Sequence, residues 1–277
     1  MLRVTVLGSG SRGNAILVDG TDGALLIDAG FGPRALATRL HAIGRRPEQI
    51  SAMLVTHEHT DHACGAVDAC RKWGWTLHAT PGTLAALAES TGGCDVPTAV
   101  LSDTTSSSID GWTVEITPVP HDARQCAAFV LTDQASGARV GIALDLGHVP
   151  SGLPVAFAQV DLLVVESNHD ERLLTNGPYP WMLKQRIGGG LGHLSNGAAA
   201  AFIARCAHRG LRGVMLAHLS ETNNTPEHAL TRTRDALRRA GWRRDALWAA
   251  HQVTAVGPVG MHGETTFRQP LQLSFGL

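Results

Sequence analysis

The sequence VTHEHTDH at residues 55–62 puts three imidazoles and a carboxylate directly after a short apolar run, residues 52–55. The run predicts a buried strand that ends just before His57. Side chains alternate along an extended chain, so His57 and His59 point the same way and can share one metal ion. Asp61 and His62 follow a bend and can face a second metal ion. The alternative is a polar loop of solvated histidines, which this tight packing of ligands against an apolar strand disfavours.

The composition favours a metal site bound by histidines and argues against sites or scaffolds built from cysteines. The chain has 277 residues, fourteen histidines and a formal net charge of −1, so any binding of a polyanion must be local. Its five cysteines are odd in number and form no C-x-x-C pair, which argues against both a disulfide framework and a thiolate zinc cage. Free thiols suit a reducing cytosol. With no signal-peptide pattern at residues 1–10 and no membrane-spanning apolar run, we expect a soluble, cytoplasmic protein without membrane contact.

Strand and helix patterns alternate along the chain. Apolar runs and period-two alternation predict strands at residues 2–7, 14–18, 24–27, 52–55, 75–79, 112–118, 126–132, 139–144, 161–165 and 213–216. Helical spacing and capping residues predict helices at 31–43, 81–90, 196–208 and from 226 onward. No linker divides the chain. We therefore predict one domain over residues 1–277, of mixed α/β (α+β) class, built as a four-layer αββα sandwich.

The pattern H-x-H-x-D-H after a strand resembles the hallmark of metallo-β-lactamase-fold hydrolases. Other stretches resemble further elements of that superfamily in the same order: LLIDAG (25–30), TPVPHDA (117–123), IALDLG (142–147) and MLAHLS (215–220). The resemblance implies a first metal bound by His57, His59 and His121. It implies a second metal bound by Asp61, His62 and His218, with Asp145 bridging both metals and Asp28 supporting the metal loop.

Each of these later residues also has an ordinary structural interpretation. Asp28 can cap backbone amides, and His121 can be a turn histidine. Asp145 can be a turn aspartate, and His218 a buried, hydrogen-bonded histidine. Their joint order and context favour the metal site. Zn²⁺ is the first expectation for such nitrogen and oxygen ligands, with Mn²⁺ or Fe²⁺ as alternatives.

A narrower resemblance points to a substrate. Seven stretches together look like the YycJ/WalJ group of this superfamily: VLGSGSRGNA, THEHTDH, HDA, ESNHD, YPW, GHLSN and LAHLS-x-x-NN. Members of that group are regarded as 5′→3′ exonucleases on double-stranded DNA. The resemblance therefore implies a nucleic acid partner, namely double-stranded DNA ends, while the oligomeric state stays open.

The GHLSN stretch, residues 192–196, predicts a second catalytic group. Ser195 or Asn196 can cap the helix that follows, and the N-terminal amides of a helix favour an anion such as phosphate. The stretch resembles a motif of tRNA 3′-processing nucleases whose histidine protonates the leaving oxygen, which implies that role for His193. A plain helix cap with an incidental histidine is the alternative. His193 also competes with His218 for the last metal position, and we favour His218 because it follows a buried strand.

Several polar residues complete the predicted site. Glu166 ends an apolar strand and can orient a ligand imidazole. Possible substrate contacts beside Ser195 and Asn196 are Ser9, Arg12, Asn14, Ser220 and Asn223. His169 can likewise support the site or contact substrate. Six other histidines are expected to be structural or on the surface; they are His41, His78, His208, His228, His251 and His262.

The resemblance, together with the GHLSN stretch, implies a dinuclear phosphodiesterase. A water shared by both metals becomes a hydroxide that attacks phosphorus, Asp61 orients it, and His193 protonates the departing sugar oxygen. A thioesterase of the glyoxalase type would use nearly the same ligands, and an RNA-processing nuclease is a further alternative. A β-lactam hydrolase is disfavoured because those enzymes are generally exported. A regulator with a structural metal is disfavoured because closed structural sites keep no open position.

Overall fold

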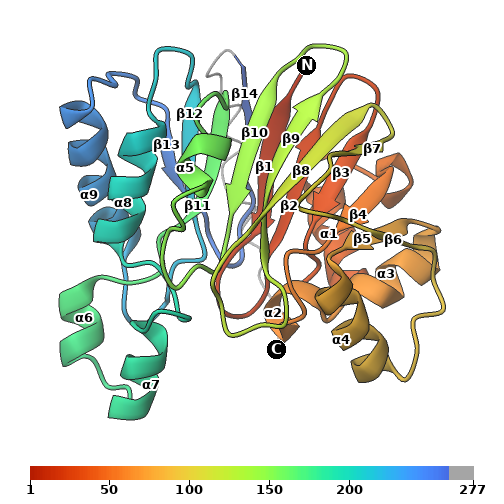
Figure 1. Cartoon of the computed structure of the whole chain (residues 1–277), viewed down its shortest axis with the longest axis horizontal. Coiled ribbons are helices and arrows are strands. Elements are labelled where there is room, and N and C mark those ends of the chain that lie inside the picture. Colours follow the sequence, from red (N-terminus) through yellow and green to blue (C-terminus); the bar gives the residue numbers. More distant parts are fainter. Residues whose placement is uncertain (262–277) are drawn as a thin grey trace.

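The computed structural model describes residues 1–261, and within them two seven-stranded sheets lie face to face with helices outside (Figure 1). The first sheet has the order β14-β1-β2-β3-β4-β5-β6, and the second the order β13-β12-β11-β10-β9-β8-β7. Strands of the first sheet are β1 (Arg3–Gly8), β2 (Ala15–Asp19), β3 (Ala24–Ile27), β4 (Ala52–Leu54), β5 (Thr76–Ala79), β6 (Thr98–Val100) and β14 (Val256–Gly260). Those of the second are β7 (Ser107–Ile109), β8 (Trp112–Pro118), β9 (Ala127–Asp133), β10 (Arg139–Ala143), β11 (Leu162–Glu166), β12 (Gly213–Ala217) and β13 (Leu247–Ala249).

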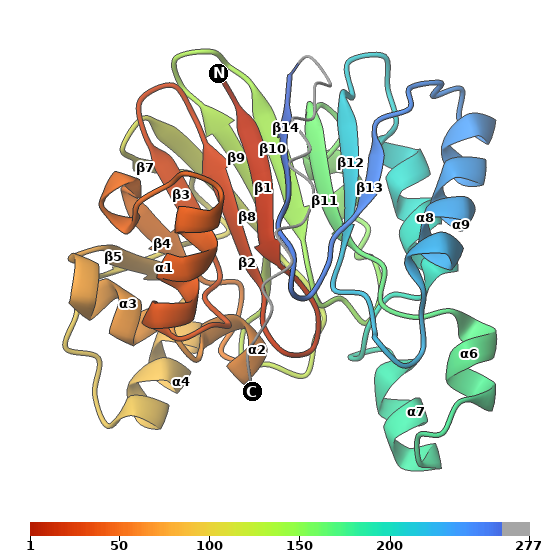
Figure 2. The same ribbon diagram turned by 180° about the vertical axis from the view of Figure 1, so that it is seen from behind.

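Helices cover the outer faces of both sheets. The helices of the described residues are α1 (Pro33–Ala42), α2 (Thr60–Ala63), α3 (Ala66–Trp73), α4 (Pro81–Thr91), α5 (Leu153–Ala156), α6 (Glu171–Asn176), α7 (Trp181–Ile187), α8 (Asn196–Cys206) and α9 (Pro226–Arg239), with one 3₁₀ turn at Pro47–Gln49. Figure 2 shows α1, α3 and α4 against the first sheet and α8 and α9 against the second. The short helices α6 and α7 lie together beyond the strand ends, next to α8.

Alternation along the strands explains the layered packing. In β2, Ile16 and Val18 enter the core between the sheets, whereas Leu17 packs outward under the helices. Strand β3 repeats this division, with Leu25 and Ile27 inward and Leu26 outward. Because both faces of these strands are covered, β2 is apolar up to its last residue, Asp19, and β3 is apolar throughout. The predicted αββα sandwich is confirmed.

Most predicted elements are present to within two residues, and the elements that were not predicted are short, with eight residues or fewer. The structure adds α2, α3, α5, α6 and α7, together with the short edge strands β6, β7 and β13 and the final strand β14. Helix α2 has four residues and α7 buries none of its seven, so neither shows an apolar stripe in the sequence. Asp61 and His62 therefore lie on a helical turn beyond the expected bend. The predicted domain boundary at 277 and His262 fall outside the described residues.

Within residues 1–261, the helices are too short or too polar for any of them to span a bilayer.

Candidate metal centre

The candidate ligands lie where parallel strands of both sheets end. β3 runs parallel to β4, and β10, β11 and β12 run parallel to one another. Asp28 follows β3, Asp145 lies two residues after β10, and His218 follows β12. All three have left-handed backbones, with φ of 61°, 55° and 51°. That conformation is costly for a side chain other than glycine and is found where the surrounding structure enforces it, often at functional sites. The strand ends thus hold these side chains toward one another.

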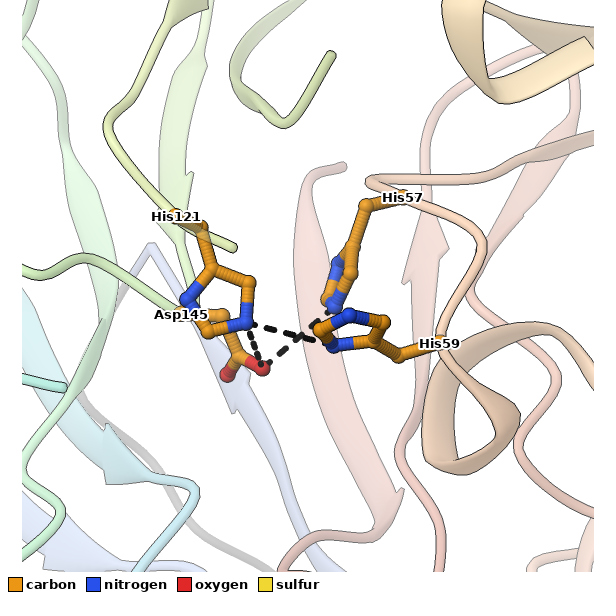
Figure 3. Close-up of side chains that lie close together, drawn as sticks. All are labelled: His57, His59, His121 and Asp145. Carbon is orange, nitrogen blue, oxygen red and sulfur yellow. Dashed lines mark hydrogen bonds and ion pairs between the residues drawn. The ribbon is translucent and has the colours of Figure 1, made fainter. Parts of the chain in front are cut away.

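The first group of ligand atoms comes from His57, His59, His121 and Asp145, all within 4.8 Å of one another. Figure 3 shows the four side chains converging from separate segments. His121 Nε2 lies 3.3 Å from His59 Nδ1 and 3.5 Å from Asp145 Oδ2. His57 Nε2 lies 3.5 Å from the same oxygen. Three imidazoles and a carboxylate surround a space of the size that a divalent cation needs.

A second group shares the same carboxylate. Asp61, His62, Asp145 and His218 place ligand atoms within 4.8 Å of one another. His218 Nε2 lies 3.1 Å from Asp61 Oδ2, and His62 Nε2 lies 3.2 Å from Asp145 Oδ2. Asp145 therefore belongs to both groups, which is the position of a bridging ligand.

Buried atoms without partners fit this interpretation. His57 Nε2 and Asp145 Oδ1 are buried, and neither has a hydrogen-bond partner in the described part of the chain. Such groups are costly to bury unless something else satisfies them, and a bound cation would do so. Burial lowers the pKa of His57 well below its usual value, helped by neighbouring imidazoles, which keeps it in the neutral form that binds metals.

The second group requires positive charge. Burial alone would lower the pKa of His218, but Asp145, Asp61 and Glu166 outweigh it and raise the pKa to about 10. Burial alone would raise the pKa of Asp61, yet hydrogen bonds from His218 and His62 hold it well below its usual value. These carboxylates therefore favour positive charge beside them, which the protonated imidazoles supply and which divalent metals can supply in their place.

Outer hydrogen bonds fix how the imidazoles face the centre. His59 Nε2 donates to the carbonyl oxygen of Asp122 over 3.2 Å, and His121 Nδ1 donates to that of Gly192 over 3.0 Å. His62 Nδ1 lies 2.7 Å from Asp28 Oδ2. In each case the other ring nitrogen is left with its lone pair toward the candidate metals. The Asp28 carboxylate also accepts hydrogen bonds from Thr56 N and Oγ1, which ties it to the start of the histidine loop.

Glu166 and His193 form a pair at the edge of the two groups. His193 Nδ1 lies 2.6 Å from Glu166 Oε1 and 3.9 Å from Asp145 Oδ1. Burial lowers the pKa of His193, but the Glu166 carboxylate outweighs that effect and the net pKa is raised. Glu166 is fully buried, and its other oxygen accepts from the backbone amides of Leu146 and Leu194. Glu166 also lies 3.4 Å from His218 Nδ1, and its role in orienting imidazoles stays a prediction.

Some of the residues predicted to contact substrate are buried, and others lie nearer the surface. Ser9, Asn14 and Asn223 are 3%, 0% and 0% exposed. Ser9 Oγ accepts from the His218 amide, and Asn14 Nδ2 donates to the Asp61 carbonyl, so both support the ligand loops. Asn223 N donates to Ser220 Oγ beside them. Their role in binding substrate stays a prediction.

Three other predicted contacts lie nearer the surface or at a helix start. Ser195 is the N-cap of α8, where its hydroxyl accepts from the Ala198 amide. The neighbouring Asn196 is 1% exposed and donates to Asn224 Oδ1. Arg12 is exposed and paired with Glu221 at 2.5 Å. Of these, Ser195 and Arg12 remain accessible to a substrate.

One polar residue near the ligands was absent from the prediction. The carboxylate of Asp122 lies 3.3 Å from His121 Nε2 and 3.7 Å from His59 Nε2, and it accepts from Arg186 of α7 at 2.7 Å. Its place directly after His121 in the quoted HDA stretch was the available signal. Asp122 links the first group to the α6–α7 segment.

The chain is similar to known proteins over most of its length. A family model described as the beta-lactamase superfamily domain matches residues 24–219, which include every predicted ligand. Exodeoxyribonuclease WalJ of Streptococcus pneumoniae is 34% identical over 235 residues, covering 82% of this chain and 85% of that protein. Exodeoxyribonuclease YycJ of Bacillus anthracis is 30% identical over 244 residues, covering 87% and 91%. The crystal structure of the metallo-beta-lactamase fold protein YhfI from Bacillus subtilis has a TM-score of 0.68 at 16% identity, covering 92% and 98%, which supports the fold alone.

Proposed function

Because this chain belongs to the beta-lactamase superfamily and is a metal-dependent hydrolase, we propose that it is a nuclease, specifically a 5′→3′ exonuclease on double-stranded DNA. The observation that carries the proposal is a pair of ligand groups sharing Asp145, with the His193–Glu166 pair beside them. Two adjacent cations with an acidic imidazole nearby suit phosphodiester cleavage. The names of two relatives, both exodeoxyribonucleases, support the choice of DNA.

We assign His57, His59 and His121 to one metal and Asp61, His62 and His218 to the other, with Asp145 between them. When bound, the two cations would lower the pKa of a shared water and neutralise charge on the phosphoryl oxygens, with zinc expected first and manganese or iron as alternatives. Asp61 is partly exposed, with 24% of its side chain accessible, so its carboxylate can orient the attacking water.

His193 is assigned to the leaving group. Its side chain is 20% exposed, so one face of the ring can reach a substrate, while Nδ1 is held by Glu166. Glu166 stabilises the imidazolium, which keeps a proton available for the departing sugar oxygen. The basic leaving oxygen of DNA needs that proton because an alkoxide is a poor leaving group.

One assay tests the substrate. Protein loaded with zinc, manganese or iron would be incubated separately with end-labelled duplex DNA, RNA and a glyoxalase-type thioester. We expect stepwise loss of nucleotides from the 5′ ends of duplex DNA. Preferential cleavage of RNA would redirect the proposal to RNA processing, and cleavage of the thioester alone would overturn it. All five cysteines are free, which supports the further proposal that the enzyme acts in the cytoplasm.

Replacing the water-orienting carboxylate tests the site. Asp61→Ala is expected to reduce DNA cleavage by at least about 10³-fold, because ligand and orienting group are lost together. Asp61 is partly exposed on a short helix, so circular dichroism should show a folded protein. Full activity of this variant would remove Asp61 from the mechanism.

A further inference from the structure

A pocket adjoins the exposed side of His193. It has a volume of about 430 Å³ and is lined by His193, Ser195, Ala198 and Arg205, among others. That volume lies in the range of small-ligand sites. We infer that this pocket holds the 5′-terminal nucleotide of the DNA strand, with its 5′-phosphate at Arg205. This inference rests on the proposed nuclease function. It assigns recognition of the 5′ end of the strand to Arg205.

The position of the proton donor sets which part of the substrate enters the pocket. In the proposed reaction a water oxygen bonds to phosphorus, the P–O3′ bond breaks, and its electron pair goes to O3′. His193 gives O3′ a proton, and the shortened strand keeps the phosphate at its new 5′ end. The released group is therefore the nucleotide attached through O3′, and it must lie on the same side as His193. His193 faces this pocket.

The walls suit a nucleotide in one orientation. Ala198 and Ala201 are exposed on one face of α8 and leave room for a sugar and base, and Arg205 lies on the same face further along. No ion pair joins Arg205 to another of residues 1–261. An arginine fork binds phosphate through two parallel hydrogen bonds. At the other end Glu171 lies so close to α8 that a Cβ atom on Gly197 would come within 2.7 Å of Oε1. That carboxylate disfavours phosphate there, which leaves the Arg205 end for it.

A buried polar group supplies independent evidence of a ligand. His169 lines the pocket and is only 4% exposed. Its Nδ1 has no hydrogen-bond partner within the described residues. An unsatisfied ring nitrogen in a pocket wall is costly unless a ligand pairs with it. Because Nδ1 is itself buried, the ring has to turn toward the pocket before a sugar oxygen or base edge of the terminal nucleotide can pair with it.

Binding of deoxyadenosine 5′-monophosphate by the metal-loaded full chain tests the pocket directly. Titration calorimetry should show binding that weakens about tenfold or more in Arg205→Gln, the magnitude typical of losing a charged hydrogen bond. Arg209→Gln is the matched control, because Arg209 is an exposed arginine just after α8 that does not line the pocket. Equal affinity of the two variants would overturn the inference.

A second variant fills the pocket with a large side chain. Ala201→Trp adds a large side chain at an exposed position of α8, which circular dichroism and thermal unfolding should show to be folded. We expect its Kd for the mononucleotide to rise at least about tenfold. Unchanged binding in this variant would also overturn the inference.

Cleavage assays separate this inference from the proposed function. Wild-type protein should degrade duplexes with 5′-phosphate ends faster than those with 5′-hydroxyl ends, and Arg205→Gln should remove that difference. If the wild type cleaves DNA and Arg205→Gln keeps the preference, the pocket assignment fails while the nuclease stands. If the wild type binds the mononucleotide through Arg205 but cleaves no DNA, the nuclease proposal fails instead.

Discussion

The ring nitrogen that faces away from the metal orients a candidate ligand imidazole through the hydrogen bond that it makes. His62 is fully buried, and its Nδ1 hydrogen bond to Asp28 is the shortest of its side-chain contacts. Asp28 is in turn held by two hydrogen bonds from Thr56. Orientation of a ligand through such a chain is worth about 10- to 100-fold in metal affinity.

Asp28→Asn should therefore weaken the second metal site. Asparagine tolerates the left-handed backbone at this position, so the strand end is kept while the charge is lost. We expect metal affinity to fall by about 10- to 100-fold, measured by competition with a chromophoric chelator. Asp22→Asn, at an exposed turn, is the control. Equal affinities of the two variants would contradict this role of Asp28.

His193 can be a proton donor or a ligand, because it also belongs to a group with Asp145, Glu166 and His218. His193→Ala separates the two roles. If it donates a proton, DNA cleavage should fall by about 10²- to 10⁴-fold. Hydrolysis of bis(p-nitrophenyl) phosphate should fall far less, because nitrophenolate leaves without a proton. Equal losses on both substrates, together with fewer bound metal ions, would instead make His193 a ligand.

At the scale of elements, the loop after β3 and helix α2 are packed backbone to backbone. The Asn14 amide donates to the Asp61 carbonyl at 2.7 Å, and the Gly30 amide donates to the Asn14 carbonyl at 2.9 Å. A Cβ atom on Gly30 would lie 1.9 Å from Asp61 O. Glycine at this position allows the approach that sets the place of α2, and with it two candidate ligands.

Gly30→Ala should displace α2 from the centre. Rigid backbone atoms cannot yield as a side chain can, so we expect a loss of about 1–3 kcal/mol in the free energy of unfolding and a lower metal content. Urea titration and elemental analysis measure these effects. Gly32→Ala is the control, because a Cβ there would meet no atom within 4 Å among the described residues. Matching results for both variants would contradict the packing argument.

At the scale of the molecule, the candidate centre joins the two sheets. His57, His59, Asp61 and His62 follow β4 of the first sheet, whereas His121, Asp145 and His218 follow strands of the second. Metal binding is therefore expected to resist separation of the layers.

Metal removal should destabilise the whole fold. Zinc at about 100 times its Kd would add about 2.7 kcal/mol to the free energy of unfolding, or roughly 5–10 °C in Tm for a chain of this size. Scanning calorimetry with a chelator and with increasing zinc measures the shift. Asp145→Asn changes both ligand groups, so its Tm should rise less with zinc than that of the wild type. A Tm that is independent of zinc would contradict the prediction.

The sequence by itself determined the sandwich and the position of each candidate ligand along the chain. Buried strands carry continuous apolar runs, and His57, Asp145 and His218 each follow such a run, so local pattern was sufficient. The resemblance implied which ligands form a group, but only the tertiary structure brings them together, because strands from distant parts of the chain place His121 beside His59 and His218 beside Asp61. It also decided the burial of Asn14, the pairing of His193 with Glu166 and the contacts of Asp122. Those features depend on how the two sheets and α7 pack against each other, which the pattern along one chain does not encode.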